Sequence, residues 1–169
     1  ALSMQANSDA TEFVFRLRPG MRWSDGAPFT AEDISFWYDD ILRNPAFGNA
    51  TPEWLTAGGN PVHVEKIDET TIAFRFDTPY GLFPTFLARP EGVEPVSYPA
   101  HFLRPLLPKY NRHADADAQK LGFKDWKDRF LSVLGTPGTI DDPSRWMNPQ
   151  VPTLNGWCLT GTYGKDDPL

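Results

Sequence analysis

Cysteine and long hydrophobic runs are scarce in this chain of 169 residues, and each scarcity excludes a class of protein. The single cysteine, Cys158, rules out an internal disulfide and any zinc site built from several cysteines. No apolar run approaches the ~18 residues of a membrane-spanning helix, so we expect no transmembrane segment. The polar start ALSMQANSDATEF does not read as a signal peptide, and a secreted parent stays compatible with a chain that begins downstream of one.

The charge balance argues against a nucleic-acid partner. The chain has 16 basic and 22 acidic residues, a net charge of −6, and no basic stripe, whereas nucleic-acid-binding domains cluster their Lys and Arg. The three histidines, His63, His101 and His113, lie far apart and form none of the short-spaced pairs that ligate zinc. We therefore predict no nucleic-acid partner, no metal and no cofactor.

The signatures of common enzymes are also missing. No GxSxG elbow is present, and Gly58-Gly59 lacks the residues that would make it a phosphate-binding loop. Cys158 lies between Trp157 and Leu159 in an apolar run, which favours packing over a nucleophilic role. We predict that the protein is not an enzyme.

Acidic residues and six tryptophans leave one enzyme-like alternative open, a glycosidase fragment or a carbohydrate-binding module. The available carboxylates include Glu91 and Glu94 as well as two adjacent pairs. Of these pairs, Asp39-Asp40 is most simply the solvated face of a helix and Asp68-Glu69 a turn.

Strong local signals are concentrated between residues 12 and 45. Residues 12–18 alternate apolar and polar side chains, which predicts a half-buried strand. A tight turn at Ser24-Asp25-Gly26 follows, and then Thr30 and Asp33 occupy the N-cap and N3 positions of a capping box. The apolar spacing beyond them predicts an amphipathic helix of roughly 12–14 residues, which Asn44-Pro45 would stop.

The rest of the chain predicts short elements. Residues 62–67 and 70–76 alternate around Asp68-Glu69, as a β-hairpin does. Residues 88–99 hold three prolines and predict an extended loop or an edge strand. Short helices are expected at 80–88, 99–107, 114–121 and 123–134, and an irregular chain from 135 onward. We predict an α+β fold with a small antiparallel or mixed sheet and four or five flanking helices.

The tryptophans differ in their surroundings. Trp23 and Trp37 bracket the opening turn and are expected to pin it to the helix, and Trp126 fits a helix face. Trp54 lies in a loop flanked by Pro and Gly and has no periodic partner, so it is a candidate for contact with a ligand. Core packing is the alternative for Trp54, and a solvated loop is the alternative for Arg89 in the proline-rich segment.

The stretch FRLRPGMRWSDGAPFTAEDISFWYDDIL resembles the signature of bacterial extracellular solute-binding proteins of the peptide/nickel-binding class, the receptors of ABC importers. The resemblance extends over about residues 10–160 and includes the segments VEKIDETTIAFRFDTPYGLFPTFLA, YPAHFL, LGFKDWKDRF and PTLNGWCLTG. The signature positions matched are Leu17-Arg18, Gly20, Trp23-Ser24-Asp25-Gly26, Pro28 and Thr30-Ala31-Glu32-Asp33.

This resemblance implies a two-lobed periplasmic-binding-protein type II-like fold that closes over a solute. Family members are several times longer, so residues 1–169 would be a single subdomain, part of lobe I, that forms one wall beside the cleft. The solute would be a peptide, an oligosaccharide, an opine or chelated nickel. The full-length parent would be periplasmic or extracellular and would dock to an ABC permease in the membrane.

The resemblance also suggests which residues serve structure and which serve binding. Trp23, Asp25, Gly26 and Thr30 belong to a scaffold that moves as one rigid body. By position, the loop after the signature helix and the segment after the hairpin's helix can reach the cleft, which implies Trp54 and Arg89 as the solute contacts.

Overall fold

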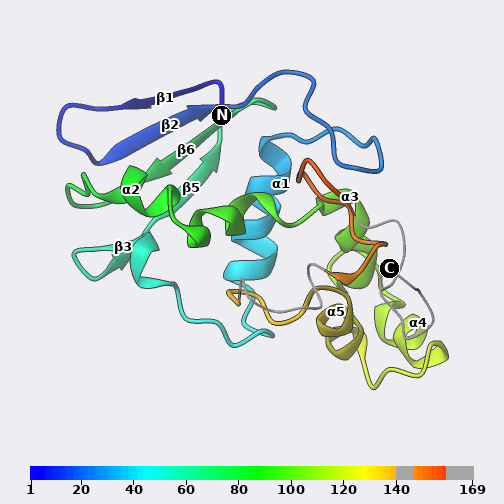
Figure 1. Cartoon of the computed structure of the whole chain (residues 1–169). Helices are drawn as coiled ribbons and strands as arrows, with labels where there is room; N and C mark the ends of the chain where they lie inside the picture. The colour runs from blue at the N-terminus through cyan, green and yellow to red at the C-terminus, as the bar shows by residue number, and fades with distance from the viewer. Residues whose placement is uncertain (140–146, 159–169) are drawn as a thin grey trace.

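The computed structural model describes residues 1–139 and 147–158. A four-stranded sheet of order β1-β2-β6-β5 lies at one end, α4 and α5 lie at the other, and α1 lies between them (Figure 1). All strand pairs of this sheet are antiparallel, and the predicted α+β class is confirmed. The strands are β1 (Ser3–Ala6), β2 (Glu12–Arg16), β5 (His63–Lys66) and β6 (Thr71–Arg75), with a separate ribbon of β3 (Thr56–Ala57) and β4 (Asn60–Pro61).

The sheet has one aromatic face and one polar face. Phe13 of β2 pairs with Phe74 of β6, which in turn pairs with Val64 of β5, so three apolar side chains share the inner face. Next to them in the register, Glu12 and His63 both pair with Arg75 on the outer face. The hairpin predicted from the alternation is therefore present as β5 and β6.

Strand β1 was not predicted. All four of its residues are exposed, so the strand lacks the apolar alternation by which a half-buried strand is recognised. It forms at the edge of the sheet by pairing with β2, from Ser3 with Arg16 to Ala6 with Phe13. Backbone hydrogen bonding holds an edge strand of this kind even where its side chains remain in water.

The signature helix begins where the capping box predicts. Thr30 is the N-cap of α1 (Ala31–Phe36), and the reciprocal hydrogen bonds with Asp33 are both present. The helix continues without a break as the π-helical segment η1 (Trp37–Leu42), so the predicted length is confirmed. Trp37 and Ile41 of this segment are fully buried in the core.

The prediction of an extended segment at residues 88–99 was wrong. After α2 (Phe83–Leu87), the chain forms the 3₁₀ helix η3 (Pro90–Val96). Pro90 opens this helix, where its fixed φ is favourable and its missing N–H has no partner to lose. Gly92 is required because a Cβ there would collide with the carbonyl oxygen of Leu87.

Short helices complete the fold and cover the remainder of the core. None of the helices within the described residues is long and apolar enough to cross a membrane. The segment predicted at 99–107 divides into two helices, because Pro105 in its middle cannot donate to an α-helical ladder. The helices are η2 (Glu53–Leu55), α3 (Ala100–Leu103), η4 (Arg104–Leu106), α4 (Ala114–Lys120) and α5 (Trp126–Leu134).

The assignment of Asp39-Asp40 to a solvated helix face holds for only one of the two residues. Asp39 is exposed and lies 3.6 Å from Arg43. Asp40 is 7 % exposed and accepts hydrogen bonds from the Lys109 ammonium and, at 2.6 Å, from the Tyr110 hydroxyl. Both donors lie about 70 residues further along the chain, so the pattern of the helix alone does not show that Asp40 is buried.

The predicted packing of Cys158 was also wrong. Cys158 is exposed, and its neighbour Trp157 is 92 % exposed. No described element therefore covers Trp157 or Cys158.

Candidate functional site

Trp54 lies on η2 and packs into the core with one face of its ring. It is 7 % exposed, and its indole stacks on the ring of Phe83 with an interplanar angle of 12° and centroids 6.3 Å apart. Phe83 is itself the centre of an aromatic cluster, with Phe13, Phe74 and Phe76 at 5.0–5.2 Å. Most of the Trp54 side chain therefore packs in the core, as the core-packing alternative expects.

The rest of Trp54 borders a small cavity of about 150 Å³. The walls are mostly apolar, and two carboxylate residues of η3 enter them. The lining residues are Trp37, Ile41, Leu42, Pro52, Trp54, Glu91, Glu94, Pro137 and Gly138.

The two glutamates of this cavity come from the segment whose conformation the sequence reading missed. Glu91 and Glu94 are three residues apart, and in a 3₁₀ helix side chains at this spacing lie on the same side. Glu94 is buried and accepts a hydrogen bond of 2.9 Å from the Tyr98 hydroxyl. One carboxylate oxygen of Glu91 is buried without a hydrogen-bond partner. An extended segment would not place Glu91 and Glu94 on the same side, so the sequence prediction missed them as a pair. Pro90 was the available signal, because proline is common at the start of a helix.

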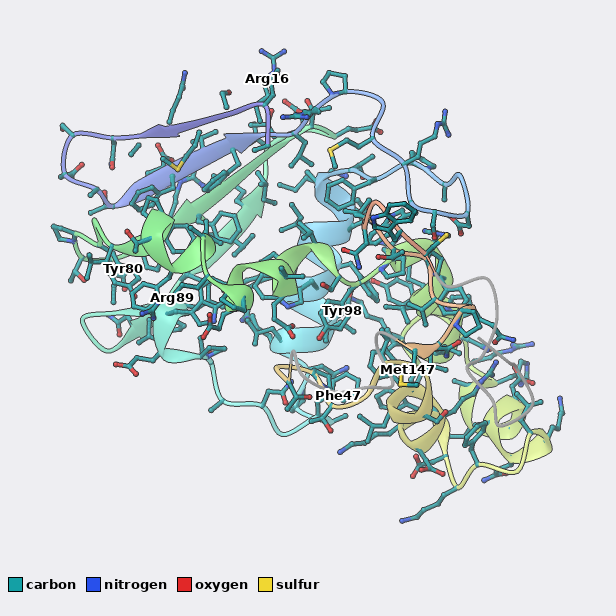
Figure 2. All side chains as sticks on the ribbon, viewed as in Figure 1. Arg16, Phe47, Tyr80, Arg89, Tyr98 and Met147 are labelled. Carbon is teal, nitrogen blue, oxygen red and sulfur yellow. The ribbon has the colours of Figure 1, made fainter. Side chains whose placement is uncertain are left out.

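Arg89 lies between α2 and η3 with an extended backbone and an exposed side chain. Its guanidinium lies over the ring of Phe86, 5.0 Å from the centroid. In the view of Figure 2, Arg89 lies on the same side of the molecule as Tyr80 and at the opposite end from Met147.

The structure places both predicted site residues against α2, at two different aromatic residues of that helix. Trp54 contacts the buried Phe83, and Arg89 covers Phe86 at the end of the same helix. Only Trp54 lines the cavity; Arg89 lies outside it. The two residues therefore frame α2 and do not form a single pocket among the described residues.

The signature helix carries a polar network that ties it to three neighbouring elements. Glu32 accepts a 2.8 Å hydrogen bond from Lys66 of β5 and also pairs with Arg104 of η4. Burial alone would raise the pKa of Glu32, but the hydrogen bonds from Lys66 and Arg104 outweigh it and hold that pKa below its usual value. Asp33 accepts the backbone N–H of Ala100 at 2.9 Å and so fixes the start of α3.

Trp23 of the signature and Trp126 of α5 both pack against other aromatic rings, as expected of structural residues. Trp23 is buried and packs edge-to-face on Phe29, with centroids 5.4 Å apart, and its ring also lies 6.4 Å from that of His101. Trp126 is partly buried on α5 and packs against Phe47. Within residues 1–139 and 147–158, no three His, Cys, Asp or Glu residues come together in a group that could hold a metal ion.

The sequence and the fold match known proteins. A family model described as "Bacterial extracellular solute-binding proteins, family 5 Middle" matches residues 1–129. The chain belongs to this family. The family consists of solute-binding proteins and not of enzymes, and its members are periplasmic or extracellular, as the sequence predicted.

Individual relatives agree with the family. The periplasmic alpha-galactoside-binding protein of Rhizobium meliloti is 31 % identical over 170 residues, which cover 99 % of this chain and 20 % of that protein. A probable ABC transporter-binding protein of Deinococcus radiodurans is 36 % identical over 41 % of this chain and 12 % of its own length. The solved oligopeptide-binding protein OppA is 32 % identical and superposes with a TM-score of 0.73 over 96 % of this chain and 24 % of its own.

This chain matches only a part of each of these relatives. The chain spans about a fifth of the alpha-galactoside-binding relative and about a quarter of the OppA chain. These two solute-binding proteins are therefore several times longer than this chain.

Proposed function

We propose that the chain is part of the substrate-binding component of an ABC importer whose full-length form binds a peptide or an oligosaccharide. The observation that carries this proposal is the family match over residues 1–129. The alpha-galactoside-binding relative supports an oligosaccharide, and the oligopeptide-binding protein OppA supports a peptide. Docking of the loaded receptor to a membrane permease belongs to the same proposal.

Residues 1–169 act in this proposal as a single subdomain, part of lobe I, which forms one wall beside the cleft. A lobe that closes over a solute moves as a rigid body, so its parts need strong internal ties. The capping box of α1 and the ion pairs of Glu32 supply ties of this kind between the sheet, the signature helix and η4.

Native mass spectrometry of the full-length receptor, purified gently from its host, tests the function. A bound mass that leaves on denaturation supports the proposal and weighs the solute directly. Titration with α-galactosides and with short peptides then separates the two solute classes. An empty receptor that binds neither class would overturn the proposal.

Sugar binding by the isolated chain of 169 residues tests the alternative that it is a carbohydrate-binding module. A module of that kind binds sugar on its own at millimolar concentration or below, whereas one wall of a cleft binds weakly or not at all. Isothermal titration of the isolated chain with the sugar that fills the receptor therefore separates the two readings.

Trp54 and Arg89 are the proposed solute contacts of this subdomain. Arg89 is exposed and held in place by Phe86, and Trp54 borders a cavity beside η3. Arg89→Ala in the full-length receptor should raise the Kd for the solute. Arg43→Ala is the matched control, because Arg43 is also exposed and lies over the ring of Tyr38 at 5.4 Å. An unchanged Kd for both Arg89→Ala and Trp54→Phe would remove these contacts.

A further inference from the structure

The signature turn binds a segment that lies 129 residues further along the chain. The backbone N–H of Ser24 donates to the carbonyl of Thr153 at 2.9 Å, and the N–H of Thr153 donates to the Ser24 hydroxyl oxygen at 3.0 Å. One residue of the turn thus satisfies both backbone groups of Thr153. In Figure 1 the segment around Thr153 runs beside α3 and close to the loop that carries the turn.

The turn is itself held on its other side. A carboxylate oxygen of Asp25 lies 2.7 Å from the Nε2 atom of His101 on α3, and its second oxygen accepts the N–H of Ala27 at 3.0 Å. The first contact fixes the turn to the helix, and the second closes the turn on itself. Ser24 therefore presents its N–H and hydroxyl from a rigid support.

The segment 151–155 gains little other polar support from this unit. Val151 and Leu154 pack at the margin of the core, partly buried. Together with Met21, Trp23 and Val96, they line an open groove of about 320 Å³, so the segment is one wall of an incompletely filled space. Apolar contacts are not directional, so they leave the segment free to slide unless hydrogen bonds fix its register.

We propose that Ser24 is a positioning residue, and that the turn of Ser24 and Asp25 is a latch that fixes the path of residues 151–155. The latch accounts for a serine at this place in the signature: its hydroxyl accepts from Thr153 while its own N–H donates to the same residue. The latch fixes how residues 151–155 lie against the signature turn. This proposal rests on the contacts of the chain itself and is independent of any solute.

Amide hydrogen exchange of the 169-residue chain, followed by NMR at Thr153, tests the latch. Ser24→Ala removes the acceptor, and loss of one hydrogen bond of ordinary strength should make the Thr153 amide exchange about two- to tenfold faster. Ser24→Thr keeps the hydroxyl and should retain slow exchange. The amide of Phe74 in the central strand β6 serves as the internal reference for an intact fold.

A second pair of variants tests the support of the turn without altering Ser24. His101→Ala removes the tether to α3 and should also make Thr153 exchange faster. His63→Ala is the matched control, because His63 lies exposed on β5 and away from the turn. Unchanged exchange at Thr153 in Ser24→Ala or in His101→Ala would overturn the latch. So would Thr153 exchange that rises only together with that of Phe74, since global loosening would then be the cause.

Discussion

Asp33→Ala should be among the most damaging single substitutions of a polar residue in this chain. One carboxylate oxygen of Asp33 accepts the N–H of Thr30 at 2.9 Å, and the other accepts the N–H of Ala100 at 2.9 Å. The residue is 4 % exposed, so alanine would leave two N–H groups without an acceptor in a site that water does not readily enter. The N-cap of α1 and the first turn of α3 would weaken together.

The magnitude follows from the two lost acceptors. An unsatisfied buried N–H costs about 1–3 kcal/mol. Because alanine also removes the desolvation cost of the carboxylate, we expect a net loss of about 2–4 kcal/mol in the free energy of unfolding. Asp39→Ala is the matched control on the same helix, where loss of the exposed contact with Arg43 should cost below about 0.5 kcal/mol.

The pH dependence of the same residue has a definite sign. Burial raises the pKa of Asp33 above its ordinary value of 3.8, although the amides of Thr30 and Ala100 act in the opposite direction. The folded state then holds this proton more tightly than the unfolded state does. The stability from this group is therefore fully present below pH 3.8 and is lost as the pH rises through the raised pKa. The side chain in Asp33→Asn cannot titrate. The free energy of unfolding of the wild type should therefore fall relative to that of Asp33→Asn as the pH rises through that interval.

Urea denaturation followed by circular dichroism, repeated from pH 3.5 upward, measures both effects. A loss for Asp33→Ala no larger than that for Asp39→Ala would refute the argument from buried hydrogen bonds. If the wild type instead becomes more stable relative to Asp33→Asn as the pH rises, the sign of the pKa shift is refuted.

Three further substitutions test other parts of the fold. Phe83→Ala should cost about 3–5 kcal/mol in urea denaturation, because Phe83 is fully buried at the centre of the aromatic cluster; a cost below about 2 kcal/mol would contradict that role. Tyr38→Phe should cost about 1–2 kcal/mol through loss of a buried hydrogen bond to a backbone carbonyl, and an unchanged stability would contradict it. Glu32→Gln should cost no more than about 1 kcal/mol, because Glu32 is partly exposed to solvent beside Lys66 and Arg104. The lowered pKa of Glu32 means that its stabilisation is lost as the pH falls below 4.5, so Glu32→Gln should flatten this acid dependence, and an unflattened profile would contradict the pairing.

The parts of the fold that the sequence predicted are those in which local chemistry and final structure agree. Thr30 and Asp33 sit three residues apart before an apolar period, and a capping box needs nothing beyond that spacing. The hairpin of β5 and β6 likewise follows from alternation on either side of a tight turn.

The failures occur where a long-range partner decides. Strand β1 has no apolar face and exists because β2 offers it an edge. Asp40 is buried because Lys109 and Tyr110, about 70 residues away, bring two donors to it. The helix η3 forms because Pro90 opens it and Gly92 allows close approach to α2. None of these partners is visible in the local pattern.

The two candidate site residues also differ in how far the local sequence predicts their surroundings. The loop around Trp54 lacks any period, which suggested exposure, yet the ring packs on Phe83. Substitution of Trp54 by a small residue would therefore lower stability, and any loss of solute affinity in that variant could not be separated from the loss of core packing. Arg89 has its guanidinium in solvent above Phe86, so its removal leaves the core intact. A change of Kd in Arg89→Ala at unchanged melting temperature is thus the measurement that isolates a solute contact of this subdomain from its folding.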